Sequence, residues 1–295
     1  MTKDPEARLK ELRADIDALD DQIIDLFYKR IDVVKQVGAM KTEHFGKQCH
    51  IRSGREGDMV RDIYHRFNDT DFHPVCAVNI WRQIISASTH MESPLSVSVL
   101  LDNSASLYWQ AREYFGNYVP TTTQPTAGRV ISDLLEDKAM IGVLPQPSME
   151  EDQSWWPHLC TSEAKDLRIF ACIPFIQTTN HRLTHPYGFA IAKLKCEPGE
   201  EDISCFGLQV SSDVSTSRLH SLFEEVKLNA VWRHMDMQNN LRRIFLTIDG
   251  FIDENNESIK TLEDKLGDAL YGINYLGTYP APLHFKDIVK NERVS

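Results

Sequence analysis

The sequence predicts a multidomain protein. We expect an all-α segment of three helices over residues 1–93, an α/β region over 94–196 and a small ferredoxin-like α+β module over 203–283. Apolar residues recur every three or four positions through the first segment. Short strand-like and helical runs alternate after Ser93-Pro94, and a βαββαβ order closes the chain. With ~100–200 residues per domain, 295 residues leave room for two or three such units.

The first helix is predicted to be very long. It begins where Asp4 can cap and Pro5 takes the first helical position, and its pattern runs on until Gly46. That length favours helix-to-helix assembly over a lone surface helix. The apolar stripe consists of Leu9, Leu12, Ile16, Leu19, Ile23, Leu26, Val33, Val37 and Met40.

Two shorter helices complete the first segment. Ser53 starts one of them, with Glu56 placed to form a capping box, and Pro74 starts the other. The second of these carries an apolar stripe that includes Trp81 and Ile84-Ile85.

The remaining elements follow from short apolar runs and the polar segments between them. We expect parallel pairing among the first strands, and a loop or excursion over 146–165 that contains Trp155-Trp156. The α/β region is predicted as strands at 97–101, near Val119, at 140–144, 167–175 and 188–194, with helices at 104–115 and 127–137. The module is predicted as strands at 203–210, 230–236 and 243–249, helices at 217–226 and 258–270, and a last strand before Gly277.

Composition narrows the classes of function. The formal net charge of −11 argues against nucleic acid as a partner, because phosphate binding needs a basic face. No run of ~18 apolar residues and no export signal is present, so we expect a cytoplasmic protein without a membrane partner. The 6 cysteines are scattered without metal-ligand spacing, which predicts free thiols and no metal site.

Polar residues interrupt the apolar stripes of all three helices. Arg30 falls in the seam of the first helix, and Lys41, eleven residues on, returns to the same face about 16 Å along the axis. Glu56 lies on the inward stripe of the second helix, and Ser88 and Glu92 continue that of the third. The alternative explanation is that Arg30 and Lys41 pair with acidic residues across a coiled-coil rim and that Glu56 only caps its helix. Because the pattern recurs on three helices, a pocket for an anion is the simpler one.

These residues carry a family resemblance. Residues 8–92 resemble the all-helical chorismate mutases of the AroQ type, which convert chorismate to prephenate in aromatic amino acid biosynthesis through the shikimate pathway. The order and approximate spacing of the family are kept. The motifs are Leu12-Arg13-x-x-Ile16-Asp17-x-Leu19-Asp20, Lys29-Arg30, Val37-Gly38-x-x-Lys41, Arg55-Glu56 and Trp81-Arg82-x-Ile84-Ile85-x-x-Ser88.

The resemblance implies a role for each of these side chains. Arg13, Arg30, Arg55 and Lys41 would hold the substrate carboxylates and ether oxygen, and Glu56 would take the ring hydroxyl. Ser88 and Glu92 would complete the wall. The reaction implied is an intramolecular rearrangement by an isomerase, which needs neither a metal nor a cofactor and proceeds by orientation and electrostatics.

Arg13 and Arg30 lie 17 residues apart, which is about 25 Å on a straight helix, and point roughly 100° apart. Both cannot reach one small molecule from a single straight copy of the helix. Either the helix bends sharply, although no Pro or Gly lies between these positions, or Arg13 reaches into a partner's site. The family resemblance implies the second, a homodimer with sites shared between protomers.

Two positions depart from some relatives. Glu92 stands where some carry glutamine, and a carboxylate there would repel the developing oxyanion, so Glu92 must be protonated to help. We therefore expect activity to fall as pH rises. Arg52 stands where some relatives have an acidic residue near the substrate hydroxyl, and it is a candidate substrate-binding residue.

The rest of the chain resembles the regions that follow such a domain in P-proteins, namely a prephenate dehydratase region and an ACT domain. Residues 101–144 resemble the first lobe of prephenate dehydratase, but Gln146-Pro147-Ser148 replaces its acidic-Asn-Ser/Thr motif and the Thr-Arg-Phe signature is missing near Gly188-Phe189. A degenerate dehydratase is therefore expected. The last module resembles an ACT regulatory domain through Thr247-Ile248-Asp249-Gly250, with altered effector motifs.

Three functions follow as hypotheses. The first is a monofunctional chorismate mutase with vestigial C-terminal domains. The second is a bifunctional chorismate mutase/prephenate dehydratase, and the third is a non-catalytic regulatory protein that docks another shikimate-pathway enzyme. A related lyase that acts on isochorismate shares the helical scaffold, so the substrate also stays open.

Overall fold

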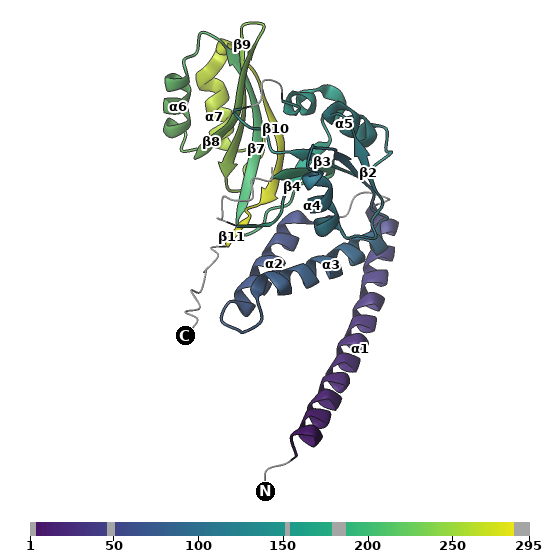
Figure 1. Cartoon of the computed structure of the whole chain (residues 1–295). Coiled ribbons are helices and arrows are strands. Elements are labelled where there is room, and N and C mark those ends of the chain that lie inside the picture. The colour runs from purple at the N-terminus through teal and green to yellow at the C-terminus, as the bar shows by residue number, and fades with distance from the viewer. Residues whose placement is uncertain (1–3, 46–50, 151–153, 179–186, 286–295) are drawn as a thin grey trace.

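The computed structural model describes residues 4–45, 51–150, 154–178 and 187–285. Three helices form the first segment, as predicted: α1 (Pro5–Phe45), α2 (Ser53–Phe67) and α3 (Pro74–Glu92). The first helix begins at the predicted cap, where the Asp4 carboxylate accepts a hydrogen bond from the backbone N–H of Glu6 at 3.2 Å. It is the long, continuous rod that projects from the body of the molecule in Figure 1.

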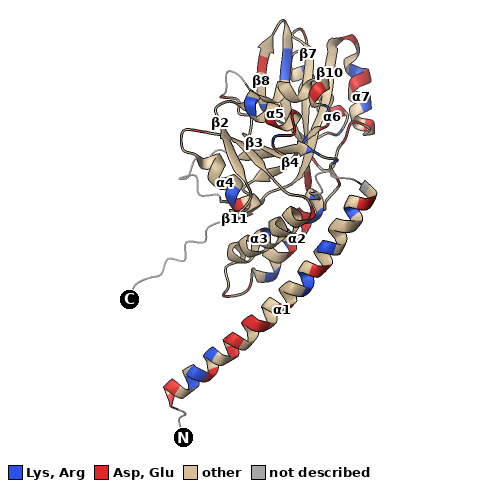
Figure 2. Ribbon diagram, turned by 90° about the vertical axis from the view of Figure 1, so that its right-hand side faces the viewer, with Lys and Arg blue, Asp and Glu red and all other residues tan. Residues whose placement is uncertain are grey.

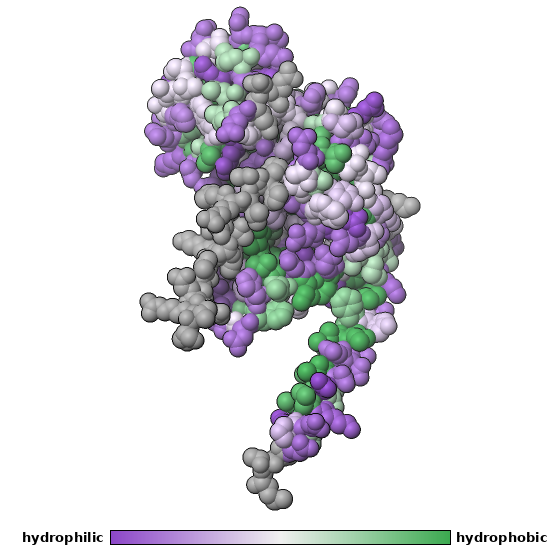
Figure 3. All heavy atoms as spheres, viewed as in Figure 1, coloured by the Kyte–Doolittle hydropathy of each residue, from purple (hydrophilic) through white to green (hydrophobic). Residues whose placement is uncertain are grey.

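Only the C-terminal half of α1 is packed. It lies against α3, whereas every described residue from Asp4 to Lys29 is exposed. On the N-terminal half of α1 the predicted apolar stripe is therefore exposed to solvent, with Ile16 at 56% and Ile23 at 60% exposure. The hydrophobic side chains run along α1 in Figure 3, while Figure 2 shows the charged residues that alternate with them.

The helices α2 and α3 pack against each other around a small apolar cluster that includes Val60, Ile63 and Ile85. The predicted capping box is wrong: α2 begins at Ser53, but no side chain caps it, and the Glu56 carboxylate bonds to Arg82 instead. A buried guanidinium is a stronger partner for a carboxylate than a backbone N–H is.

The second helix also rests on the C-terminal part of the chain. A Cβ at Gly57 would lie 2.6 Å from Cγ of Pro280, so only glycine allows this approach. The buried side chain of Arg61 donates to the carbonyl of Ala281 at 2.9 Å and pairs with Glu201 at 3.1 Å.

The α/β region begins with parallel strands, as predicted. Strand β1 (Val97–Leu100) lies between β2 (Thr121–Gln124) and β3 (Ile141–Pro145), and both pairs are parallel. The connecting helices are α4 (Ser106–Phe115) and α5 (Ala127–Leu135). The strand predicted near Val119 begins two residues later, because Val119 itself is buried in the loop that precedes the strand.

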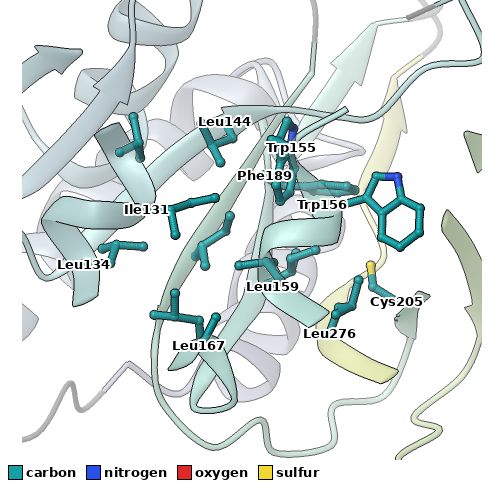
Figure 4. Close-up of a cluster of buried hydrophobic side chains, with 14 of the residues drawn as sticks. Ile131, Leu134, Leu144, Trp155, Trp156, Leu159, Leu167, Phe189, Cys205 and Leu276 are labelled. Carbon is teal, nitrogen blue, oxygen red and sulfur yellow. The ribbon is translucent and has the colours of Figure 1, made fainter. Parts of the chain in front are cut away.

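The predicted excursion after β3 forms the short 3-10 helices η1 (Trp156–Cys160) and η2 (Ser162–Ala164). Trp155 donates its indole N–H to the carbonyl of Pro145 at 2.8 Å, and Trp156 is fully buried. These side chains fill a core between the two C-terminal regions (Figure 4). Three strands follow: β4 (Leu167–Ile173), β5 (Ile176–Thr178) and β6 (Gly188–Lys193).

The last module has the predicted βαββαβ order. Its helices pack on one face of the sheet, around a cluster that includes Phe206, Leu222 and Leu262. The elements are β7 (Asp202–Ser211), α6 (Thr216–Glu225), β8 (Ala230–Gln238), β9 (Leu241–Asp249), α7 (Glu257–Leu266), η3 (Gly267–Ala269) and β10 (Leu270–Pro280), and β11 (Leu283–Phe285) then pairs with β5.

One sheet runs through both C-terminal regions. Within the described residues its order is β2-β1-β3-β6-β4-β10-β7-β9-β8. The junction is the parallel pairing of β4 with β10, where Gly277 lies opposite Ile169. The sheet therefore continues across the boundary that separates the α/β region from the βαββαβ module.

A cleft of about 1240 Å³ lies between these two regions and is lined by Arg168, Lys193 and Tyr275, among others. None of the predicted site residues lines it. In the described part of the chain, no helix combines the length and the apolar character that crossing a membrane requires.

Candidate active site

The site begins with the one face of α1 that is packed. Arg30, Ile31, Val34, Gly38 and Lys41 recur at helical spacing, and over residues 5–44 of α1, where burial is described, they are the ones that are not exposed. The helices approach closely at Gly38, where a Cβ would lie 3.3 Å from Cα of Glu92. The two predicted cations are thereby brought to the C-terminal end of α3.

Each cation of α1 meets a predicted residue of α3. The Arg30 guanidinium donates to the Ser88 hydroxyl, which itself donates to the carbonyl of Ile84 at 2.7 Å. Lys41 forms an ion pair with Glu92 at 2.5 Å, and these side chains are 23% and 12% exposed. The alternative explanation, in which a cation of α1 pairs with an acidic residue, therefore agrees with the ion pair of Lys41.

Glu56 enters the same site from α2. It pairs with Arg82 at 3.1 Å, and the two side chains are 15% and 8% exposed. Burial raises the pKa of the Glu56 carboxyl above its ordinary value. The positive charge of Arg82 counteracts that rise most strongly, and the charge of Lys41 also counteracts it, while the charge of Glu92 adds to it. The influence of Lys41 and Glu92 on Glu56 ties the three helices to one site.

Burial also lowers the pKa of the Arg30 guanidinium, and the Glu92 carboxylate counteracts this effect. An arginine keeps its charge under any such shift at neutral pH. The site thus holds three cations, Arg30, Lys41 and Arg82, beside two acids, Glu56 and Glu92. This arrangement can bind an anion and can place a cation beside an oxygen on which negative charge develops.

Three predicted site residues lie elsewhere in this chain. Arg13 lies on the exposed half of α1, and because the helix is continuous it stays about 25 Å along the axis from Arg30. Arg52 pairs with Glu197 at 2.7 Å, and both side chains are about half exposed. Arg55 is exposed on the first turn of α2, beside Glu56.

Sequence reasoning assigned no role to Arg82. The signal was present, because Val78, Arg82 and Ile85 follow one another at helical spacing and all three are buried. A charged residue on a buried stripe needs a partner. Glu56, on another helix, is the partner that the pattern could not identify.

Residues 12–93 match the model of the family chorismate mutase type II. The N-terminal helices are therefore a domain of this class, which accounts for less than a third of the 295 residues.

The similar curated proteins extend the likeness beyond the helices. One is the bifunctional chorismate mutase/prephenate dehydratase of Aquifex aeolicus, 30% identical over 46% of this chain and 38% of its own length. A second, of the same description, comes from Pseudomonas aeruginosa and is 26% identical over 49% of this chain and 40% of its own length. A third, the T-protein of Haemophilus influenzae, is 34% identical over 20% of each chain. The chain thus spans about two fifths of the length of the bifunctional relatives it matches.

Solved structures give a more distant likeness. GqqA, described as a novel type of quorum quenching acylase, has a TM-score of 0.47 at 14% identity over 63% of this chain and 94% of its own. Prephenate dehydratase from Streptococcus mutans has a TM-score of 0.44 at 11% identity over 65% of this chain and 100% of its own. At these scores the likenesses carry no weight for fold or function.

Proposed function

We propose that the protein is a chorismate mutase, an isomerase that converts chorismate to prephenate in aromatic amino acid biosynthesis. The observation that carries this proposal is the convergence of Arg30, Lys41, Glu56, Ser88 and Glu92 from three helices. The match of residues 12–93 to chorismate mutase type II and the names of the curated relatives support it.

The reaction breaks an ether C–O bond and forms a C–C bond within one molecule. Arg30, held by Ser88, would bind a substrate carboxylate and keep the compact, reactive conformer. Lys41 would leave Glu92 and donate to the ether oxygen as negative charge develops there. The Glu56 carboxylate would accept a hydrogen bond from the ring hydroxyl.

We also infer that the active unit is a homodimer. The uncovered stripe on α1 includes Leu12, Ile16, Leu19 and Ile23, which is more apolar surface than a helix leaves in water without a partner. A second copy would cover this stripe and bring its own Arg13 to the site around Arg30. The cytoplasmic location expected from the sequence stays a prediction.

The experiment that tests the proposal follows the loss of chorismate on addition of the pure protein and identifies the product. Prephenate alone is the expected product. Phenylpyruvate would reveal the bifunctional enzyme, and pyruvate with salicylate would reveal a lyase. Unchanged chorismate would overturn the proposal and leave the non-catalytic alternative.

Variants connect that activity to the site. Lys41→Met should lower kcat about 100- to 1000-fold, the cost typical of removing one donor to a developing oxyanion. Lys35→Met is the matched control, because Lys35 lies on the exposed face of the same helix. Equal activity of the two variants would contradict the role of Lys41.

A further inference from the structure

Arg82 lies behind the candidate site and is buried between two regions of the chain. One of its terminal nitrogens, Nη1, donates to Glu56 at 3.1 Å, while its Nε has no hydrogen-bond partner among the described residues. Its Cζ lies 3.9 Å from the centroid of the Tyr114 ring on α4. The guanidinium thus presents its edge to a carboxylate and its face to an aromatic ring.

This arrangement suits arginine in particular. A planar guanidinium can donate in its plane and stack on a ring at the same time, whereas the ammonium of lysine is a compact point charge. Tyr114 belongs to α4, which lies outside the matched residues 12–93. The chain beyond the family match therefore contacts the charged group that holds Glu56.

We propose that Arg82 is a positioning residue that fixes the Glu56 carboxylate in the mutase site, and that Tyr114 of the α/β region holds Arg82 in place. The proposal rests on the proposed function and deepens it. It makes a segment outside the catalytic domain part of the support of the active site.

The charges around Glu56 show what Arg82 contributes. From α1 Glu56 faces Lys41, from α3 it faces Arg82 and Glu92, and from α4 the phenol of Tyr114 lies within electrostatic range. Lys41 already pairs with Glu92. Arg82 is therefore the cation that directly contacts Glu56, and its loss should raise the pKa of Glu56 further.

An ion pair that only stabilised the fold would have different consequences. Its removal would lower the stability of the protein, but substitutions of Tyr114 would not change the pKa of Glu56. The test therefore measures the titration of the Glu56 carboxyl by carbon-13 NMR, with Glu56→Gln to assign the resonance. The pH profile of kcat/KM with chorismate is measured beside it.

In Arg82→Gln we expect the Glu56 resonance to titrate at higher pH, the acid limb of the activity profile to move the same way, and kcat/KM to fall by up to about 100-fold. Arg82→Lys should restore the acid limb because it keeps the charge. Its kcat should stay low because the planar fork is lost. Where Arg82→Gln does not fold, Arg82→Lys and the variants of Tyr114 carry the test.

Tyr114→Leu should shift the Glu56 titration in the same direction as Arg82→Gln, and Tyr114→Phe should leave it unchanged because the ring remains. Tyr108→Leu is the matched control. Tyr108 lies on the same helix, but its ring contacts Arg112, whose Cζ lies 5.6 Å from the ring centroid, and Trp109.

An unshifted Glu56 titration in Arg82→Gln and Tyr114→Leu would overturn the proposal, as would equal shifts in Tyr114→Leu and Tyr108→Leu. The NMR titration needs no turnover. A wild-type protein that leaves chorismate unchanged would therefore disprove the proposed function alone, and the titration would still show whether Arg82 and Tyr114 control Glu56.

Discussion

At the scale of single residues, the Lys41–Glu92 ion pair matters most to the proposed reaction. The two groups lie 2.5 Å apart, and their side chains are 23% and 12% exposed. The proposed role requires Lys41 to exchange Glu92 for the ether oxygen of the substrate, so a change at either residue should alter the rate.

Glu92→Gln tests that exchange. We expect Glu92→Gln to convert chorismate at least as fast as the wild type at neutral pH, because an amide can donate a hydrogen bond to the ether oxygen and a carboxylate cannot. Steady-state kinetics with chorismate at about pH 7 checks this, and a slower variant would contradict the role of position 92 as a donor.

The buried carboxyl group of Asp202 lies away from the candidate site. Burial raises the pKa of Asp202, Asp58 adds to the rise, and the backbone N–H of Gly199 and the charge of Arg61 oppose it. Its Oδ1 is buried and has no hydrogen-bond partner in the described part of the chain. The carboxylate is thus held in ionised form at a cost to the folded state.

Because the pKa of Asp202 is higher in the folded than in the unfolded state, the folded protein binds this proton more tightly. The wild type should therefore lose stability as pH rises through that pKa, and Asp202→Asn should not. We expect the variant to gain most over the wild type near pH 7 and least below about pH 4. Urea unfolding at several pH values measures this, with the exposed Asp264→Asn as the control. An equal difference at every pH would contradict the prediction.

At the scale of elements, the position of α2 decides whether Glu56 reaches the site. The helix is held between α3 and β10, and Gly57 is the contact point with Pro280. The rigid proline ring cannot move aside as a flexible side chain would.

Gly57→Ala should therefore destabilise the protein, although alanine favours a helix by about 1 kcal/mol. Overpacking typically costs about 1–3 kcal/mol, so we expect a net loss of about 1–2 kcal/mol together with lower mutase activity, because Glu56 is the neighbouring residue. Gly128→Ala in α5 is the control, since a Cβ there meets nothing within 4 Å. Urea unfolding decides, and equal stability of the two variants would contradict the prediction.

Periodicity predicted the helices and the βαββαβ module well, because amphipathic stripes of ten or more residues leave few alternatives. The strand β2 was displaced in the prediction because its sequence, Thr121 to Gln124, carries no apolar alternation at the edge of the sheet. The site was predicted where polar residues interrupt a stripe, as at Arg30 and Glu56. The partner of Glu56 could not be predicted, because it depends on how α2 and α3 cross.

At the scale of the whole molecule, one sheet runs through both the α/β region and the βαββαβ module. The α/β region and the βαββαβ module were predicted as separate units, and pattern reasoning had no means to predict the single pairing of Gly277 with Ile169. A Cβ at Gly277 would lie 2.5 Å from the backbone nitrogen of Ile169, so the junction depends on a glycine.

The proposed homodimer has a test of its own. Arg13→Ala and Arg30→Ala should each be inactive, and a mixture of the two, unfolded and refolded together, should recover about one quarter of the wild-type activity. Half of the randomly formed dimers would be mixed, and each mixed dimer would hold one intact site. No recovery would contradict sites shared between protomers, and a mixture of two Arg30→Ala preparations is the control.

The contact of α2 with Pro280 and the contact of Arg82 with Tyr114 bear on how this domain could move between genes by recombination. A stretch of DNA that encodes only residues 12–93 would carry the helices to a new gene without Pro280 and Tyr114. Under the proposed role of Arg82, the segment that recombination could move without losing this support is longer than the segment that the family model matches.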